Sequence, residues 1–348
     1  FLISHIESIM RFYHPRCIDN KNGGFFQHFR DDGSVYDFDT RHLVSSTRFI
    51  FNYSMASIEL DNDEYKDVIR HGIEYLRQFH LNTKTGSYAW ILEGKDVQDS
   101  TNYCYGFAFV LLAYSTALRA GILEAKDFID ETFDVMEKHF WSKEHELYSD
   151  EISADWQVVS SYRGQNANMH SCEALIMAFE ATGSQKYLDR ALLIGKNICI
   201  RQAGLAEGLI WEHYDSNWEI NWVYNKNRPD DLFRPWGFQV GHLTEWAKLL
   251  LILERHVKED WLLPRAQELF DDAVEMGWDE KSEGLFYGFA PNGDISDKDK
   301  YFWVQAESLA AAAVLAKRTG DDYYWEWYDR IWNYSWKHMI DHKYGAWF

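Results

Sequence analysis

Two histidines, each followed three residues later by a glutamate, are the residues of this sequence best suited to proton-transfer chemistry. One pair is His242 and Glu245, and the other is His170 and Glu173. Residues three apart on a helix share a face, so each carboxylate is placed to orient its histidine and to hold its charge. Histidine moves protons readily near neutral pH. The two pairs, each opening an apolar helix, predict acid–base chemistry at equivalent positions of a repeated architecture.

A turn signature that recurs about every sixty residues supports such a repeat. It consists of a glycine or glutamate followed by apolar residues, and it begins at Gly24, Gly86, Glu146, Gly208, Gly284 and Gly345. By subtraction, the intervals are 62, 60, 62, 76 and 61 residues. Between successive turns lie two patterns in which apolar residues recur at i, i+3 and i+4, which is the period of a helix.

These patterns predict an all-α protein built from helical hairpins. The first helix of each hairpin is expected over residues 41–59, 101–120, 167–182, 239–257 and 303–318. The second is expected over residues 64–80, 124–140, 185–201, 261–277 and 321–338, and residues 3–13 supply one more helix. The first helices are more apolar and are predicted to form an inner ring, with the more charged second helices outside. The predicted fold is an (α/α)6 barrel that forms one domain over residues 1–348.

A closed ring of six hairpins needs twelve helices, whereas the sequence predicts eleven. The chain reaches Phe348 just after the sixth turn, where another inner helix would begin. A barrel without one inner helix would expose its core, so we expect the last inner helix to be missing from this sequence.

The longest interval between turns contains an insertion over residues 215–236, immediately before the His242 helix. Long loops in compact domains are often functional, so a substrate-covering loop is predicted here, with surface elaboration as the alternative. Trp236 lies in this aromatic and glycine-containing stretch and is a candidate sugar-binding residue. Loop aromatics can stack on sugar rings or pack between hairpins, and both interpretations stay open.

Composition excludes several classes of partner. The formal net charge of −20 argues against nucleic acid, which requires a basic surface, and against an anionic membrane surface. No apolar run approaches the roughly 20 residues of a membrane span. The four cysteines show no C-x-x-C spacing, which predicts a reduced, cytoplasmic protein. The sequence carries no signature of an oligomeric state.

If the ring closes, the N-terminal ends of the inner helices meet at one mouth of the barrel. The residues expected there are Arg41 or Arg48, Tyr103, Asn168, His170, Glu173, His242, Glu245, Trp303, Gln305 and Glu307. This mixture of histidines, carboxylates, an arginine, amides and aromatic rings suits a neutral polyhydroxylated ligand. The sequence has no phosphate-binding glycine loop, no nucleophilic serine elbow and no H-E-x-x-H or Cys/His cluster. Neither a metal nor another cofactor is therefore predicted.

Each candidate also has a structural interpretation. A single histidine near a helix start is more often structural than catalytic. Arg48 lies among apolar neighbours, so it is predicted to be either an internal ion-pair partner or a ligand clamp. Glu307 lies in an otherwise apolar helix and needs the same explanation.

Four stretches together resemble the N-acylglucosamine 2-epimerase superfamily, and the resemblance spans the whole chain. They are Arg41-His-Leu-Val-Ser-Ser-Thr-Arg48, Asn168-Met-His-Ser-Cys-Glu173, Gly241-His-Leu-Thr-Glu-Trp246 and Trp303-Val-Gln-Ala-Glu307. The superfamily includes cellobiose 2-epimerases and aldose–ketose isomerases that act on mannose or sulfoquinovose. The stretch over residues 40–49 looks closest to the mannose isomerases.

The resemblance implies an (α/α)6 barrel without metal or nucleotide at the active site, and it implies roles for individual residues. His242 matches the family's catalytic histidine, with Glu245 beside it. His170 matches the histidine associated with ring opening, and Arg48 matches the arginine near the C1–C2 hydroxyls of the sugar. Trp303 and Glu307 match further pocket positions.

The family's second catalytic histidine normally lies on the last inner helix, and this sequence ends before that helix. His338 and His342 precede the sixth turn and are poor substitutes for it.

The predicted activity is aldose–ketose isomerisation, with D-mannose and D-fructose as the favoured pair, through a cis-enediol. A 2-epimerase of the N-acylglucosamine or cellobiose type is the main alternative, because it uses the same residues and returns the proton to the opposite face of C2. A sulfoquinovose isomerase is a further alternative. An (α/α)6 glycoside hydrolase would need two carboxylates and would leave the histidines unexplained. A non-catalytic sugar-binding protein would have no need of acid–base groups.

Overall fold

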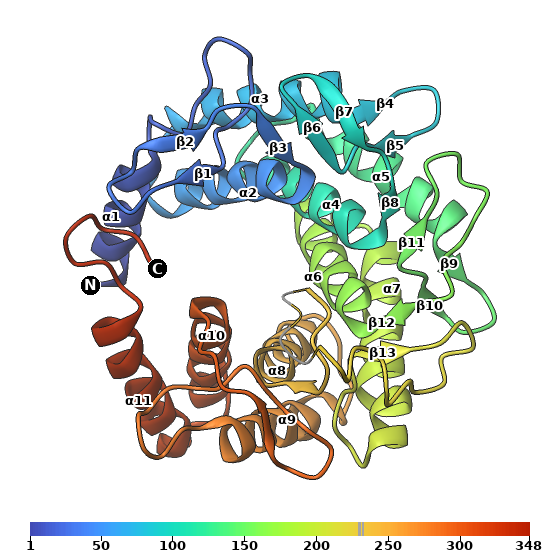
Figure 1. Ribbon diagram of the computed structural model, residues 1–348, viewed down its shortest axis with the longest axis vertical. Helices are drawn as coiled ribbons and strands as arrows, with labels where there is room; N and C mark the ends of the chain where they lie inside the picture. Colours follow the sequence, from blue (N-terminus) through green and yellow to red (C-terminus); the bar gives the residue numbers. More distant parts are fainter. Residues whose placement is uncertain (229–230, 232) are drawn as a thin grey trace. The chain divides into compact units, whose positions relative to one another are not determined.

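The computed structural model describes residues 1–228, 231 and 233–348, and its regular structure is mainly helical. The part of the chain that it describes contains eleven α-helices, as predicted (Figure 1). They are α1 (Leu2–Tyr13), α2 (Leu43–Glu59), α3 (Tyr65–Tyr75), α4 (Cys104–Arg119), α5 (Ala125–His139), α6 (Gln165–Thr182), α7 (Gln185–Lys196), α8 (Val240–Glu254), α9 (Leu262–Gly277), α10 (Phe302–Thr319) and α11 (Asp322–His338). π-Helical turns over Leu76–His80 and Asn197–Gln202 follow α3 and α7.

Short strands, which the sequence did not reveal, lie between the helices. They are β1 (His28–Phe29), β2 (Val35–Asp37), β3 (Thr40–His42), β4 (Leu81–Asn82), β5 (Ser87–Tyr88), β6 (Ile91–Glu93), β7 (Asp96–Asp99), β8 (Asn102–Tyr103), β9 (Trp141–Ser142), β10 (Leu147–Tyr148), β11 (Glu151–Ile152), β12 (Arg163–Gly164), β13 (His213–Tyr214), β14 (Phe238–Gln239), β15 (Gly288–Phe289) and β16 (Ile295–Asp297). The named strands pair antiparallel, as β3-β6-β7 and β14-β15-β16 and in five pairs such as β12-β13.

The chain divides into two compact units. Unit 1 contains residues 1–161, 173–190 and 341–346, and unit 2 contains residues 162–172, 191–340 and 347–348. In unit 1, α2 packs against α4, and α3 and α5 pack on α2 and α4, respectively. In unit 2, α8 packs against α10, and α9 and α11 are their hairpin partners (Figure 1). In both units the mutual contact is therefore made by the first helix of each hairpin.

The distribution of apolar residues explains which helices take the central position. α4 is buried at nearly every residue from Cys104 to Ala117, and α8 is similarly buried. α9 instead buries one stripe, including Ala266, Leu269 and Ala273, and exposes a charged face, as an amphipathic outer helix does. No helix in the described part of the chain is both long enough and apolar enough to cross a membrane.

The repeated turn signature corresponds to a left-handed backbone residue. The signature residues have φ angles of 69°, 73°, 53°, 96°, 76° and 97° at Gly24, Gly86, Glu146, Gly208, Gly284 and Gly345, respectively. This region of φ strongly favours glycine, which explains why five of the six positions hold that residue.

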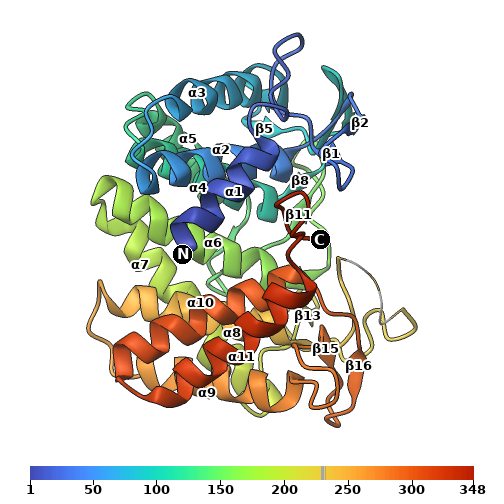
Figure 2. The same cartoon turned by 90° about the vertical axis from the view of Figure 1, so that its left-hand side faces the viewer.

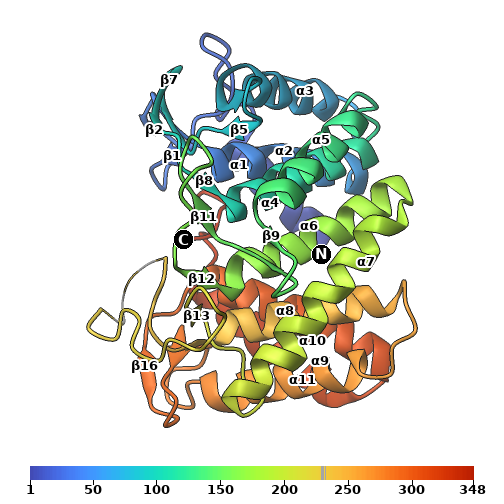
Figure 3. The ribbon, with the colours of Figure 1, turned by 90° about the vertical axis from the view of Figure 1, so that its right-hand side faces the viewer.

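In each unit the short strands gather toward one end of the helices. Figure 2 shows β13, β15 and β16 at one end of the helices of unit 2, and Figure 3 shows β1, β2 and β8 at one end of those of unit 1. β3, β8, β12 and β14 run directly into the first turns of α2, α4, α6 and α8. The side chains on the first turns of these four helices are therefore positioned by the helix and by the strand that precedes it.

Candidate active site

His242 lies on the first turn of α8, and its ring is held by a carboxylate from a distant part of the chain. Nδ1 lies 3.0 Å from Oε1 of Glu212, which directly precedes β13. Both side chains are nearly buried, with exposed fractions of 12% for His242 and 5% for Glu212. A charge-assisted hydrogen bond from Nδ1–H to the carboxylate leaves Nε2 as the proton acceptor. The sequence missed Glu212, although this residue occupies a fixed position after the repeated turn.

His170, on α6, also meets a carboxylate. Its Nδ1 lies 3.7 Å from Oε1 of Glu245, and both side chains are largely buried. The distance is too long for a hydrogen bond but suits an ion pair once the ring is protonated. Glu245 lies one helical turn after His242, so the two histidine–carboxylate contacts occupy one face of α8.

The partners differ from those that the H-x-x-E spacing predicts. Glu245 was expected to orient His242, whereas Glu212 provides the carboxylate at its Nδ1 and Glu245 contacts His170. Glu173 lies one turn after His170 on α6. The helical spacing placed His242 and Glu245 on one face of α8, but each of these residues contacts a partner from another element: Glu212 before β13 and His170 on α6.

Trp303 forms an aromatic wall beside His242. Their ring centroids are 5.2 Å apart, and Tyr287 packs edge-on against the indole. The indole approaches the backbone of α8 so closely that a Cβ at Gly241 would lie 2.4 Å from Cζ3 of Trp303. Glycine before His242 therefore permits this close approach, and the predicted pocket position of Trp303 lies next to the predicted catalytic histidine.

Glu307 has the partner that the sequence requires. It forms an ion pair with Lys248, across the packed helices α10 and α8. The exposed fractions are 27% for Glu307 and 14% for Lys248, so the pair is only partly accessible to solvent. The adjacent hydrogen bond between Thr244 and Ser308, at 2.9 Å, joins the same two helices.

The two arginines that open the first hairpin have different environments. Arg41 is 1% exposed and pairs with Asp19 at 2.9 Å, so the internal ion pair belongs to Arg41. Arg48 is exposed, its guanidinium lies 4.5 Å from the centroid of the Phe109 ring, and no described residue forms an ion pair with it. Of the two alternatives for Arg48, the internal ion pair is not found among the described residues, and the ligand clamp stays a prediction.

Tyr103 belongs to an aromatic cluster in unit 1. Its ring centroid lies 4.5 Å from that of Trp90, which in turn packs edge-on at 4.3 Å against His42. Burial lowers the pKa of His42 to about 4, although the carboxylate of Asp99 raises it in part. His42 is therefore neutral near pH 7.

Asn168 lies on the first turn of α6 and is fully buried. Its side-chain amide donates to the carbonyl of Gly164 at 3.3 Å, so at least one of its hydrogens serves the local backbone.

Trp236 lies at the end of the insertion over residues 215–236, of which residues 229, 230 and 232 are outside the described residues. Its indole N–H donates to the carbonyl of Trp222 at 2.7 Å, and Lys226 lies over its ring. Trp211, by contrast, is fully buried, so for that residue the interpretation as packing between hairpins is correct.

His213 anchors this insertion beside Glu212. Its Nε2 lies 2.7 Å from the carbonyl of Pro235, and its Nδ1 lies 3.0 Å from the hydroxyl of Tyr162. Burial lowers the pKa of His213 despite the neighbouring Glu212 carboxylate. A neutral ring fits both contacts, with Nε2–H donating to the carbonyl and Nδ1 accepting from the hydroxyl.

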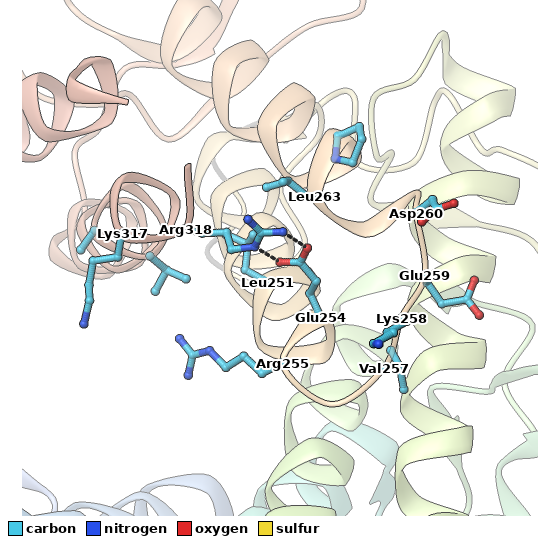
Figure 4. Close-up of a pocket in the computed structure, with 13 residues that line it drawn as sticks. Leu251, Glu254, Arg255, Val257, Lys258, Glu259, Asp260, Leu263, Lys317 and Arg318 are labelled. Carbon is cyan, nitrogen blue, oxygen red and sulfur yellow. Dashed lines mark hydrogen bonds and ion pairs between the residues drawn. The ribbon is translucent and has the colours of Figure 1, made fainter. Parts of the chain in front are cut away.

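A cavity of about 990 Å³ lies at the opposite end of α8 (Figure 4). Its apolar floor includes Leu251 and Val314, and its rim carries the bidentate pair of Arg318 and Glu254 at 2.7 and 2.8 Å. Glu254 is twelve residues after His242, which corresponds to about 18 Å along a helix. The cavity is therefore separate from the histidines.

Two of the residues described above offer ligand atoms that a metal could use, namely His170 and Glu245 in unit 2. The same two groups equally suit proton transfer, because an imidazole near a carboxylate can be charged or neutral near pH 7.

The described residues thus form helical hairpins that hold two histidine–carboxylate contacts, one of them beside the indole of Trp303. A family model described as N-acylglucosamine 2-epimerase matches residues 24–348. The chain belongs to this family.

One relative is the D-mannose isomerase of Marinomonas mediterranea, which is 58% identical over 349 residues, covering 100% of this chain and 88% of the relative. A crystal structure of D-mannose isomerase superposes with a TM-score of 0.98 at 58% identity, covering 100% of this chain and 89% of that one. Cellobiose 2-epimerase from Bacillus thermoamylovorans has the same fold, with a TM-score of 0.86 at 18% identity over 100% of this chain and 90% of that one. The predicted (α/α)6-barrel fold is thereby confirmed.

Proposed function

We propose that this chain is an aldose–ketose isomerase that interconverts D-mannose and D-fructose. The contact between the buried Glu212 carboxylate and His242 Nδ1 carries the proposed chemistry, because it fixes the tautomer whose Nε2 accepts a proton. The 58% identity to a D-mannose isomerase over the whole chain supports the choice of substrate.

In the proposed reaction the pyranose ring opens first, which gives an aldehyde at C1. We assign this step to His170, whose charge Glu245 can stabilise. Nε2 of His242 then removes the proton from C2. The electron pair of that C–H bond forms the C1–C2 double bond of a cis-enediol, while the C1 oxygen takes up a proton.

The enediol collapses when the C2 hydroxyl loses its proton and C2 becomes a carbonyl. The imidazolium returns its proton to C1, which completes the ketose. One base on one face is sufficient, and no oxidant or reductant enters the balance. The lone pair on Nε2 is restored at the end of the cycle.

Other residues have proposed roles in binding the sugar. Arg48 would stabilise the developing oxyanion, because its guanidinium is exposed and has no ion-pair partner among the described residues. Trp303 is proposed to contact a sugar face, since its ring lies beside His242. The remaining candidates for substrate binding are Asn168, Glu173, Tyr103, Glu307 and Trp236.

A 2-epimerase is the second candidate, and membership of the family favours it specifically. Epimerisation would use the same enediol but would return the proton to the opposite face of C2, which requires an acid on each side. The structure of a cellobiose 2-epimerase shares the fold, and at 18% identity that likeness concerns the fold alone.

Incubation of the purified enzyme with D-mannose in deuterium oxide, followed by NMR, tests the proposal. Fructose carrying deuterium at C1 is the expected product. Glucose labelled at C2 as the first product would assign the chain to the 2-epimerases. Absence of exchange with mannose, and then with cellobiose, N-acetylmannosamine and sulfoquinovose, would overturn the enediol mechanism.

We further propose that both units form one catalytic domain, because the family model spans residues 24–348. A cytoplasmic location is also a proposal, and it is supported by four cysteines that are free and buried.

A further inference from the structure

A buried series of hydrogen bonds lies behind His242, on the side of the ring that carries Nδ1. The indole N–H of Trp246 donates to Oε1 of Gln165 at 2.7 Å. Nε2 of Gln165 donates to both oxygens of Glu212, at 3.2 and 3.0 Å. Glu212 accepts the Nδ1–H of His242 at 3.0 Å. Trp246 and Gln165 are fully buried, and Glu212 is 4% exposed.

Local backbone pairing places these groups together. β12 and β13 are antiparallel, with Gly164 opposite His213. Gln165 follows β12 and Glu212 precedes β13, so the next pair in the register brings them face to face. The backbone N–H of Gln165 donates to the carbonyl of Glu212 at 3.2 Å. Because Gln165 also begins α6, its amide is fixed by both a strand pair and a helix.

The chemistry of Trp246 decides which way the Gln165 amide points. An indole nitrogen can only donate, so the atom facing it must be the carbonyl oxygen of Gln165. The amide nitrogen then faces Glu212 and lies 3.0 Å from Nδ1 of His242. The amide N–H of Gln165 and Nδ1–H of His242 both point to the Glu212 carboxylate, and both are satisfied when each donates to it. Nδ1 therefore carries the proton.

The proximity of Gln165 has an electrostatic consequence. Its amide hydrogens present the positive end of a dipole to the imidazole and share the lone pairs of Glu212 with it, so a variant without this amide should protonate the ring more readily than the native protein does. The titratable groups on the elements around His242 include Glu212 and the neutral His213 beside it, Glu245 with its contact His170, and the ion pair of Lys248 and Glu307 between α8 and α10. From α10, the ring that faces His242 is the uncharged Trp303.

We infer that Gln165, oriented by Trp246, is a positioning residue that acts through Glu212 to fix the tautomer of His242. This inference rests on the proposed function insofar as His242 is the base. It adds two residues that act through Glu212 without touching the sugar.

The experiment compares Gln165→Leu with the native enzyme. Leucine has a similar volume but removes both donors to Glu212 and the dipole beside Nδ1. We expect kcat for mannose isomerisation at pH 7 to fall about tenfold while KM changes less than about twofold. The acid limb of the kcat/KM profile should move up by about one pH unit, because the unprotonated ring is the active form.

Gln239→Leu is the matched control. Gln239 is also a buried glutamine, three residues before His242, but neither polar atom of its side chain has a hydrogen-bond partner among the described residues. Its replacement should leave the acid limb in place. A shift of the same size in both variants would overturn the inference, since it would then reflect general disturbance of α8.

Nitrogen-15 NMR of the histidine rings separates this inference from the proposed function, because it requires no turnover. The native enzyme without substrate should show Nδ1–H at His242, and Gln165→Leu should raise the titration midpoint by about one pH unit. If Gln165→Leu does not fold, Trp246→Phe frees the amide and should move the midpoint in the same direction. An unchanged tautomer and an unchanged midpoint would overturn the inference even if the enzyme isomerises mannose.

Discussion

Trp90 in unit 1 and Glu212 in unit 2 occupy the same place in the repeat. The backbone carbonyl of Trp90 accepts a hydrogen bond from the backbone N–H of Leu43, the first residue of α2, at 2.9 Å. The backbone carbonyl of Glu212 accepts a hydrogen bond from the backbone N–H of Gln165, the first residue of α6, at 3.2 Å. Each side chain also contacts a residue at the start of the next hairpin: Trp90 contacts Tyr103 of β8, which directly precedes α4, and Glu212 contacts His242 on the first turn of α8.

The side chain at this position determines what the neighbouring histidine can do. Trp90 contributes an aromatic surface to His42, and burial lowers the pKa of that histidine to about 4. Glu212 instead supplies a carboxylate that can hold a charged His242. The same position of the repeat thus lies beside a buried neutral histidine, His42, in unit 1 and beside the proposed base, His242, in unit 2, although the first histidine precedes this position along the chain and the second follows it. We therefore expect the side chain at this non-helical position to determine the environment of the neighbouring histidine.

The largest expected effect comes from removing each histidine in turn. His242→Asn should lower kcat/KM for mannose about 10³-fold, because a general base contributes about 10²- to 10⁴-fold. His42→Asn should lower it less than about threefold, since His42 caps α2 through Nδ1 and asparagine also caps helices well. Steady-state kinetics with equal losses in the two variants would remove the distinction between the units.

A stability effect follows from the buried histidine His80 of unit 1. Its Nδ1 lies 2.8 Å from the carbonyl of Ala89, and its pKa is lowered to about 4, mainly by burial. In the unfolded chain the pKa of the His80 side chain is near 6.5. Between pH 6.5 and 4 this side chain therefore binds more protons in the unfolded chain than in the folded one. The contribution of His80 to stability should therefore be constant above pH 6.5 and fall by about 3 kcal/mol as the pH drops to 4.

Urea unfolding at a series of pH values measures this loss. The variant His80→Gln keeps a donor but does not titrate, so its stability should fall by about 3 kcal/mol less over the same interval. The same slope in both proteins would show that His80 does not control the acid sensitivity.

Replacing Glu212 and Trp90 by residues of similar shape tests the comparison directly. Glu212→Gln should lower kcat/KM about 10²-fold, because an amide can face Nδ1 with either its oxygen or its nitrogen and no longer selects one tautomer. Trp90→Phe keeps an aromatic ring and should cost less than about threefold. The check is kinetic, with circular dichroism to establish that both variants are folded. A larger loss for Trp90→Phe would assign the critical role to unit 1.

The smallest expected effect concerns Arg48. Arg48→Met should lower kcat/KM about tenfold, because an exposed guanidinium stabilises charge less strongly than a buried one. The matched control is Arg30→Met, which removes another exposed arginine over an aromatic ring of unit 1, in this case Tyr36. The control should retain native kinetics, and equal losses would contradict a specific role for Arg48.

The helices could be predicted from the sequence because their apolar period extends over many residues. The segment expected over 261–277, for example, is α9 at Leu262–Gly277. The strands could not be predicted, since segments of two to four residues, such as Gly288–Phe289, are too short to show an alternating pattern. The sequence could not show that Arg41, and not Arg48, is the buried arginine, because both lie in the same stretch. The partner of Arg41, Asp19, is 22 residues away.

The candidate site was predicted only in part, for a similar reason. Helical spacing brings His242 and Glu245 to one face, but it contains no information about residues outside the helix. Glu212 lies in a turn thirty residues earlier, at a position that the repeat aligns with Trp90 and Asp150. Comparison of the five repeats at that position would have shown His28, Trp90, Asp150, Glu212 and Gly288, so two of the five residues are acidic.

The contact between Trp303 and Gly241 limits how the specificity of this enzyme can be redesigned. The indole lies against the bare backbone of α8, where a Cβ would be only 2.4 Å away, so it has no room to retreat toward that helix. Binding a larger sugar on this side would require a smaller residue at position 303. A library that varies the more distant loops while retaining Trp303 would leave the indole in its present place beside His242.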